Sequence, residues 1–278
     1  MTQSNIEAKS NRQPPAKSNS QAWYHPTFSP EHGVYVMLFV SFVTGAALAQ
    51  AWKFSTTLAL ICAFSGFQAE HPLILQLKQR RSFKPRFLVW GSFYSSVSVA
   101  IAFWLYSIYP VLLWLYGGAI AALAIDAISI FRRKQKSIVN ELITFAAVCL
   151  SAPLAYAATM GTISATAMGL WVLNTLYFSS TIFTVKLRKL KTSSIVPGII
   201  YQAIATGIVA TLYWFNYLPP LAALALGIAL LKFTLVAWQK QWYNTVKIQY
   251  VAMLESLTAF IFLIVVALSV LPAHLTTL

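Results

Sequence analysis

The chain has 278 residues, of which 58% are hydrophobic and only 9% are charged. A soluble domain carries about 25% charged residues, so this composition excludes an ordinary globular protein in water and predicts one surrounded by lipid. The formal net charge of +14 would favour nucleic acid in a soluble protein. Membrane proteins retain Lys and Arg on their cytoplasmic side, which explains the charge, and we expect no nucleic-acid partner.

The first predicted element is a tail. Residues 1–30 are polar and rich in Ser, Asn, Gln and Pro. Such a segment buries too little apolar surface to offset the entropy lost on ordering, and it lacks the apolar core of a secretory signal. We therefore expect a disordered N-terminal tail over residues 1–30 and a single transmembrane domain over residues 31–278.

Nine later segments satisfy the rule that a membrane-spanning helix needs about 20 mostly apolar residues. In chain order they are residues 33–52, 54–75, 87–106, 111–131, 141–160, 167–185, 195–215, 221–238 and 250–271. The predicted fold is all-α, a polytopic membrane bundle of about nine helices. Pro72 is expected to interrupt the second helix, and Pro153 and Pro197 to kink two others.

The basic residues alternate between connections. The stretch KQRRSFKPR at residues 78–86 is followed by a connection without charge, SIYP, and the pattern repeats along the chain, with Lys53 as an exception. Because basic loops stay inside, the pattern predicts a cytoplasmic N-terminus and a C-terminus on the opposite side of an inner, plasma or thylakoid-type membrane. The basic loops either retain this orientation beside lipid headgroups or converge on an anionic ligand. Lys232, within its helix, is expected to snorkel towards the cytoplasmic surface.

Five acidic residues lie in or at the cytoplasmic ends of the predicted helices: Glu31, Glu70, Asp126, Glu141 and Glu255. An ionisable group inside a membrane costs about 2.5–3.5 kcal/mol on insertion scales, and it normally faces the bundle interior beside a partner. Their similar depth predicts one buried polar cluster. The cluster is either a set of structural ion pairs or a binding pocket open to the cytoplasmic half of the bilayer.

The residues predicted to bind a substrate are polar and lie near the cytoplasmic side. They are Glu31, His32, Glu70, His71, Arg80, Arg81, Asn140, Glu141, Asn174, Tyr177, Lys186 and Arg188. No catalytic residue and no metal site can be assigned. Asp126 is the single aspartate of the sequence, so the usual Asp-rich Mg²⁺ motifs are absent. Cys62 and Cys149 lie in apolar runs and are expected to be free thiols in the core.

Three segments resemble the YwiC-like family of integral membrane proteins. They are SPEHGVYVMLFVSFVTG (29–45), RRKQKSIVNELITFAAVCLSAPLAYAA (132–158) and WVLNTLYFSSTIFTVKLR (171–188). The family is largely uncharacterised, so the resemblance implies a membrane fold without naming an activity.

The helix number, the orientation and the polar loops after the second, fourth and sixth helices also resemble the UbiA superfamily of intramembrane prenyltransferases. This resemblance implies a UbiA-like arrangement and an isoprenoid substrate. UbiA enzymes hold Mg²⁺-diphosphate with Asp-rich motifs, whereas the corresponding places here offer only Glu70 and Asn174. A diphosphate would therefore be held by Arg and Lys, or this chemistry has been lost.

Three functions remain open. The first is a UbiA-like, prenyltransferase-like enzyme acting on an isoprenoid or quinone-type lipid at the cytoplasmic side. The second is a binder of a lipid, quinone or pigment that assists assembly of a respiratory or photosynthetic membrane complex. The third is a small-molecule or ion transporter, in which the intramembrane acids Asp126 and Glu255 would be coupling sites.

Overall fold

A computed structural model describes residues 24, 26–79, 84–132, 135–188 and 194–271. In chain order the helices are α1 (His32–Ala49), α2 (Phe54–Lys78), α3 (Pro85–Ile108), α4 (Leu112–Phe131), α5 (Ile138–Cys149), α6 (Ser151–Met160), α7 (Ala165–Lys186), α8 (Val196–Trp214), α9 (Pro220–Leu224), α10 (Leu226–Trp238), α11 (Lys240–Thr245) and α12 (Ile248–Val270). There is no strand in these described ranges.

Nine helical segments within the described residues are long and apolar enough to cross a membrane. Seven are single helices. The other two are composite: α5 and α6 together form the span Ile138–Met160, and α9 and α10 together form the span Pro220–Trp238. The predicted number of spans and the all-α class are confirmed, and the chain is an integral membrane protein in contact with lipid.

Pro72 does not interrupt its helix as the sequence predicted. α2 continues through Pro72 to Lys78 without a break, so the predicted interruption is wrong. Proline removes a single hydrogen bond of the helix ladder, and here neighbouring packing holds the helix together, because Gly91 of α3 lies against Leu73 and Pro72. Pro153 instead lies in the first turn of α6, just after Leu150 separates it from α5.

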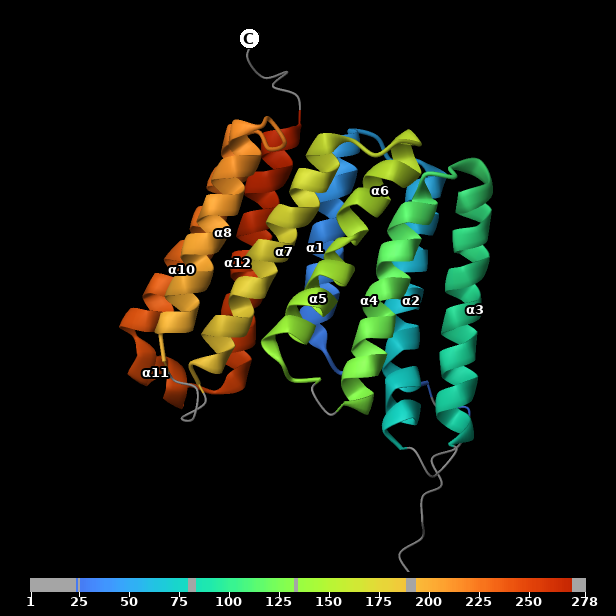
Figure 1. Ribbon diagram of the computed structural model, residues 1–278, viewed down its shortest axis with the longest axis horizontal. Helices are drawn as coiled ribbons and strands as arrows, with labels where there is room; N and C mark the ends of the chain where they lie inside the picture. The colour runs from blue at the N-terminus through green and yellow to red at the C-terminus, as the bar shows by residue number, and fades with distance from the viewer. Residues whose placement is uncertain (1–23, 25, 80–83, 133–134, 189–193, 272–278) are drawn as a thin grey trace, which may run out of the picture.

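The two ends of the bundle differ in charge. The start of α1 and the ends of α2, α4 and α7 lie together at the lower end of the molecule in Figure 1. We call this the basic end, because it carries helix-terminal residues such as Lys78, Lys84, Arg132, Lys186 and Lys247. Lys53 lies at the opposite end, where its Nζ donates to the Thr159 carbonyl over 2.7 Å.

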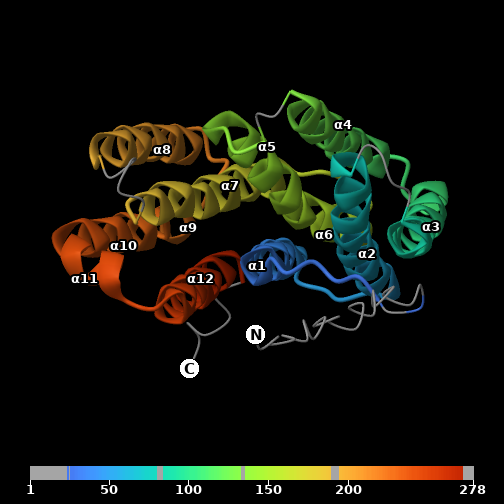
Figure 2. The same ribbon diagram turned by 90° about the horizontal axis from the view of Figure 1, so that it is seen from below.

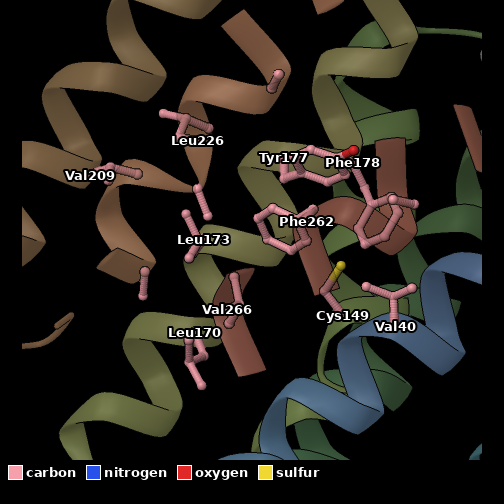
Figure 3. Packing of buried hydrophobic residues seen from close by; sticks show 14 of the residues in the cluster. Val40, Cys149, Leu170, Leu173, Tyr177, Phe178, Val209, Leu226, Phe262 and Val266 are labelled. Atoms are coloured by element: carbon pink, nitrogen blue, oxygen red, sulfur yellow. The ribbon is translucent and has the colours of Figure 1, made fainter. Parts of the chain in front are cut away.

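Seen along the helices, the bundle has a centre and two sides (Figure 2). The centre consists of α1, α5 and α6. We call α2, α3 and α4 the first side, and α7 to α12 the second side. Each side shares its own apolar core with the centre: one cluster contains residues of α1, α2, α3, α4 and α6, and a larger one contains residues of α1, α5, α7 to α10 and α12. In the larger cluster the rings of Tyr177 and Phe262 stack with centroids 3.9 Å apart (Figure 3).

The central helices approach closely because their facing residues are small. A Cβ added to Gly45 of α1 would lie 1.9 Å from the carbonyl oxygen of Ala152 in α6. Ser151 adds a hydrogen bond between the same helices, from its Oγ to the Leu38 carbonyl over 3.2 Å. Membrane helices associate through such small residues and interhelical hydrogen bonds, because lipid gives them no hydrophobic drive to pack.

The outer helix α3 of the first side buries far fewer residues than α7 of the second side. Only Gly91 and Leu105 are buried in α3, although that helix runs from Pro85 to Ile108. In α7, by contrast, eleven residues are buried. The outer helices α3 and α4 thus expose most of their residues, and the candidate site lies between them and the centre of the bundle.

Candidate functional site

A cavity of about 340 Å³ lies between the first side and the centre of the bundle. Its walls come from α2, α3, α4, α5 and α6, with Leu38 contributed by α1. Most of the lining is apolar, including Phe67, Leu73 and Leu154. Two carboxylates, Glu70 and Asp126, also line it. The volume falls within the range of small-molecule sites, which are mostly apolar with a few placed polar groups.

Asp126 is the more buried of the two carboxylates, with 5% of its surface exposed. Its Oδ1 accepts a hydrogen bond of 2.6 Å from Asn140 Nδ2, which also donates to the Gln135 carbonyl over 3.2 Å. Since both partners of this nitrogen are acceptors, the amide orientation is determined. The second carboxylate oxygen, Asp126 Oδ2, has no hydrogen-bond partner. A buried polar atom without a partner carries a desolvation cost, so Oδ2 is a ready acceptor.

Glu70 extends the acidic character of this end of the cavity. It is half-buried in α2, and it lies near enough to Asp126 and Glu31 for their charges to interact. The lining residues that the structure describes include these two carboxylates and no Lys, Arg or His. This part of the cavity therefore accepts hydrogen bonds and repels anions.

A hydroxyl marks the other end of the cavity. Tyr116 lines it from α4, and its hydroxyl is buried without a hydrogen-bond partner. Ten residues of α4 separate Tyr116 from Asp126, which corresponds to about 15 Å along a helix axis. The cavity is thus elongated along the membrane normal, with its carboxylates towards the basic end.

The cavity reaches the outer surface of the bundle between α3 and α4. Val99 of α3 and Ile120 of α4 both line it, yet they are 66% and 67% exposed. Leu123, one turn further along α4, is also a lining residue and is 44% exposed. Because this surface faces lipid in a membrane protein, an apolar molecule can enter sideways from the bilayer.

A second polar group lies at the basic end of the central helices. Lys186 of α7 forms an ion pair with Glu141 of α5 at 2.7 Å. Arg188 Nη2 donates to the Val246 carbonyl over 2.7 Å, and its guanidinium lies 5.9 Å from the Tyr243 ring centroid. Burial of that ring, with the charge of Glu255 nearby, raises the pKa of Tyr243 to about 12. These predicted anion-binding residues are thus engaged in joining α5, α7 and α11.

A third group, on the second side, contains a buried ion pair. Lys232 Nζ of α10 lies 2.6 Å from Glu255 Oε2 of α12, and the Lys232 side chain is 1% exposed. Thr181 donates to the same oxygen over 2.9 Å, and Thr184 donates to Oε1 over 3.2 Å. Both oxygens of this carboxylate are therefore satisfied. The expectation that Lys232 snorkels outwards is wrong, because an ion-pair partner is available inside the bundle.

Two more predicted site residues have structural surroundings. Asn174 is fully buried, and its Nδ2 donates to Thr44 Oγ1 over 3.0 Å and to the Leu170 carbonyl over 2.8 Å. It thereby links α7 to α1. Tyr177 belongs to the larger apolar core, and Lys232 Nζ lies 5.3 Å from the centroid of its ring. Neither residue lines the cavity.

The remaining candidates lie near the start of α1 and the end of α2. Glu31 occupies the N-cap position of α1 without a side-chain capping hydrogen bond, and both it and His32 are exposed. His71 is half-buried in α2, and it does not line the cavity. Arg80 and Arg81 lie outside the described residues. Among the described candidates, Glu70 is the one that lines the cavity.

The chain ahead of α1 closes over this region. The Ser29 backbone N–H donates to Gln68 Oε1 over 3.2 Å, and Gln68 Nε2 also contacts the Tyr35 hydroxyl. Arg86 Nη2 of α3 donates to the Pro26 carbonyl over 2.8 Å. The tail predicted over residues 1–30 thus includes a short piece that lies against α2 and α3, whereas residues 1–23 and 25 lie outside the described part of the chain.

The five acids that were expected in one buried polar cluster have different surroundings in the structure. Glu70 and Asp126 line the cavity, Glu141 pairs with Lys186, and Glu255 pairs with Lys232 on the second side. The depth of each acidic residue along the membrane normal can be estimated from the sequence. The side of the helix on which a polar residue meets a partner cannot, because every span here is apolar around most of its circumference.

The sequence analysis did not identify several residues of the cavity and of the buried ion pair. Tyr116 carried no signal, because an isolated tyrosine in an apolar helix is also typical of lipid contact. The pair Lys232–Glu255 did carry one: each is an ionisable residue deep in a span, and opposite charges in a membrane usually find each other. Cys62 and Cys149 are free and buried as predicted. In the described ranges no three His, Cys, Asp or Glu side chains form a group that could hold a metal ion.

Comparison with known proteins adds one finding. The family model described as YwiC-like protein matches residues 28–156. Over this stretch, which is just under half of its length, the chain is similar to the YwiC-like family. The match runs from just before α1 to within α6, so it includes every helix that lines the cavity. No curated protein and no solved structure matches the chain.

Proposed function

We propose that this YwiC-like protein binds an isoprenoid or quinone-type lipid in the cavity between α2 and α6. The observation that carries the proposal is the form of the cavity: apolar walls, a carboxylate end at Glu70 and Asp126, and an opening towards lipid between α3 and α4. A lipid with a long apolar tail and a small polar head matches these three features. We further infer that the basic end faces the cytoplasm, because basic loops are retained there.

The cavity favours binding over prenyl transfer from a diphosphate. Its described lining has two acids and no base, whereas diphosphate needs cations or metal around it. Lys186 and Arg188, which were expected to hold an anion, contact Glu141 and the Val246 carbonyl instead. A UbiA-like arrangement remains our hypothesis for the fold, since it rests on the helix number and the polar residues near the basic end.

Transport is the second candidate, and Asp126 favours it. A buried carboxylate with one unpartnered oxygen in an intramembrane cavity is the kind of group through which transporters couple a proton or cation to a substrate. Flux of a substrate into proteoliposomes, driven by a pH gradient and lost in Asp126→Asn, would establish this function. Binding without flux supports the lipid binder.

The proposal can be tested by a substitution that fills the cavity with a larger side chain. Ala122 lines it, whereas its neighbour Ala121 is exposed and does not. Ala122→Phe and Ala121→Phe therefore add the same ring to the same helix at different positions. We would measure binding to the purified protein by native mass spectrometry. The probes are farnesol and a decyl-substituted benzoquinone in its oxidised and reduced forms.

We expect at least one probe to bind the unmodified protein and Ala121→Phe, and Ala122→Phe to lose that binding. Equal binding by both variants would place the ligand elsewhere and overturn the proposal. Absence of binding by every probe would also overturn it. A far-UV circular dichroism spectrum and a size-exclusion profile verify that each variant is folded.

A further inference from the structure

The unpartnered oxygen of Asp126 indicates which kind of lipid head group the cavity can bind. Asp126 lines the cavity with only 5% of its surface exposed, and its Oδ2 has no hydrogen-bond partner. Oδ1 is already taken by Asn140 Nδ2 at 2.6 Å. An ionised carboxylate can only accept hydrogen bonds. A ligand group placed at Oδ2 would therefore have to be a hydrogen-bond donor.

We propose that the cavity selects lipids whose head carries a hydroxyl donor, such as the phenolic hydroxyl of a hydroquinone, over the same lipids with a carbonyl head. This inference rests on the proposed function and names the chemistry of its ligand. A phenolic O–H donates to Asp126 Oδ2 and forms a charge-assisted hydrogen bond. A quinone carbonyl in the same place sets two acceptors against each other and leaves the carboxylate oxygen unpaired.

Glu70 strengthens the discrimination. It lines the same part of the cavity, and its charge interacts with that of Asp126. Its carboxyl oxygens are further acceptors for a hydroxyl head group in this part of the cavity. The described lining offers no Lys, Arg or His that would donate to the oxygen of a carbonyl there.

A neutral donor fits this site better than an organic cation. The opening lies between the lipid-facing residues Val99 and Ile120, so the ligand arrives from hydrocarbon, where a charged head is costly. The protein itself satisfies Oδ1 with a neutral amide N–H. A neutral hydroxyl at Oδ2 would complete the same pattern.

The experiment compares the two redox forms of one probe. Dissociation constants of a decyl-substituted benzoquinone and of its hydroquinone are measured anaerobically on the purified protein in detergent. A hydrogen bond to a charged group contributes about 1.5–3 kcal/mol, so we expect the hydroquinone to bind at least about tenfold more tightly. In Asp126→Asn the side-chain amide can supply a donor, and the preference should fall below about threefold. Glu70→Gln should reduce it by a smaller factor, and this second variant keeps the test usable if Asp126→Asn fails to fold.

Equal affinity for the two forms, or an unchanged preference in Asp126→Asn, would overturn the inference. If that equal binding is still lost in Ala122→Phe, the proposed function stands and only the hydroxyl selection is wrong. If neither form binds, both fail. Decylamine serves as the cationic probe: tighter binding of decylamine than of the hydroquinone would assign a cation as the ligand and contradict the choice of a hydroxyl.

Discussion

Asp126 on the first side and Glu255 on the second side are carboxylates in the basic half of their helices, yet their surroundings differ. Glu255 has Lys232 at 2.6 Å and a threonine donor on each oxygen. Asp126, which lines a cavity, has one amide donor, and its second oxygen is buried without a hydrogen-bond partner. A membrane protein gains from satisfying a buried charge. The second side thus satisfies its buried charge within the protein, whereas in our proposal the first side keeps an acceptor free for a ligand.

Packing follows the same division. The second side and centre share the larger apolar core, whereas α3 buries little of its surface. Cavities and unpaired polar groups lower stability, so a protein retains them where function needs them. The following variants, from the largest expected effect to the smallest, test whether the two sides respond in opposite ways.

The largest effect is expected from breaking the ion pair. Lys232→Met leaves the Glu255 carboxylate in the bundle without its cation. Removing one partner of a buried pair costs about 3–5 kcal/mol. Unfolding in detergent micelles, followed by circular dichroism, measures the loss. The exposed Lys247 gives the control: Lys247→Met should change stability by less than about 0.5 kcal/mol.

The double variant Lys232→Met with Glu255→Leu sharpens this result. Replacing a whole buried pair by apolar residues is often neutral or stabilising, so most of the lost stability should return. A single Lys232→Met variant as stable as the unmodified protein would contradict a structural role for the pair.

A smaller loss is expected at the junction between α1 and α6. Gly45→Ala places a Cβ 1.9 Å from the Ala152 carbonyl oxygen, and the backbones must move apart. Overpacking of this kind costs about 1–3 kcal/mol. Gly207→Ala is the matched control, since nothing lies within 4 Å of its added Cβ. A stable Gly45→Ala protein would mean that these helices are not in close contact.

The opposite sign is expected on the first side. Asp126→Asn removes a buried charge whose Oδ2 is unpartnered, and we expect stability to rise by about 1 kcal/mol. Glu255→Gln, measured in the same denaturation assay, should lose stability because Lys232 loses its partner. Losses of equal size in both variants would remove the distinction between the two sides.

The smallest effect concerns the two thiols. Cys62 lines the cavity, whereas Cys149 lies in the larger apolar core with no exposed surface. N-ethylmaleimide should modify Cys62 several-fold faster than Cys149, as read by mass spectrometry of the peptides. Bound hydroquinone should slow the reaction of Cys62 alone. Equal rates at the two cysteines would contradict an accessible cavity.

Much of the fold was predictable because lipid imposes simple rules. Apolar length predicted nine spans, and the alternation of basic residues predicted which helix ends lie together. The breaks at Leu150 and Ala225 escaped prediction, since a local turn inside an apolar run changes no composition. The break predicted at Pro72 was wrong, because α2 continues through this proline.

The site was predictable only in part. Glu70 and Asp126 stood out as acids in the membrane, and both line the cavity. Asn174, Tyr177 and Lys186 stood out as polar residues near the cytoplasmic side, yet they connect helices. Which polar residues face space and which face a partner depends on how helices rotate about their axes. Packing between distant segments determines that rotation, and a single sequence does not record it.

The central claim is that the cavity between α2 and α6 holds a lipid with its head at Asp126. Photocrosslinking tests it most directly, using a decyl hydroquinone that carries a diazirine in its tail. The account predicts crosslinks on peptides of α3 and α4, around Val99 and Ile120, and their loss in Ala122→Phe but not in Ala121→Phe. Crosslinks confined to α8, α10 or α12, or unaffected by Ala122→Phe, would contradict it.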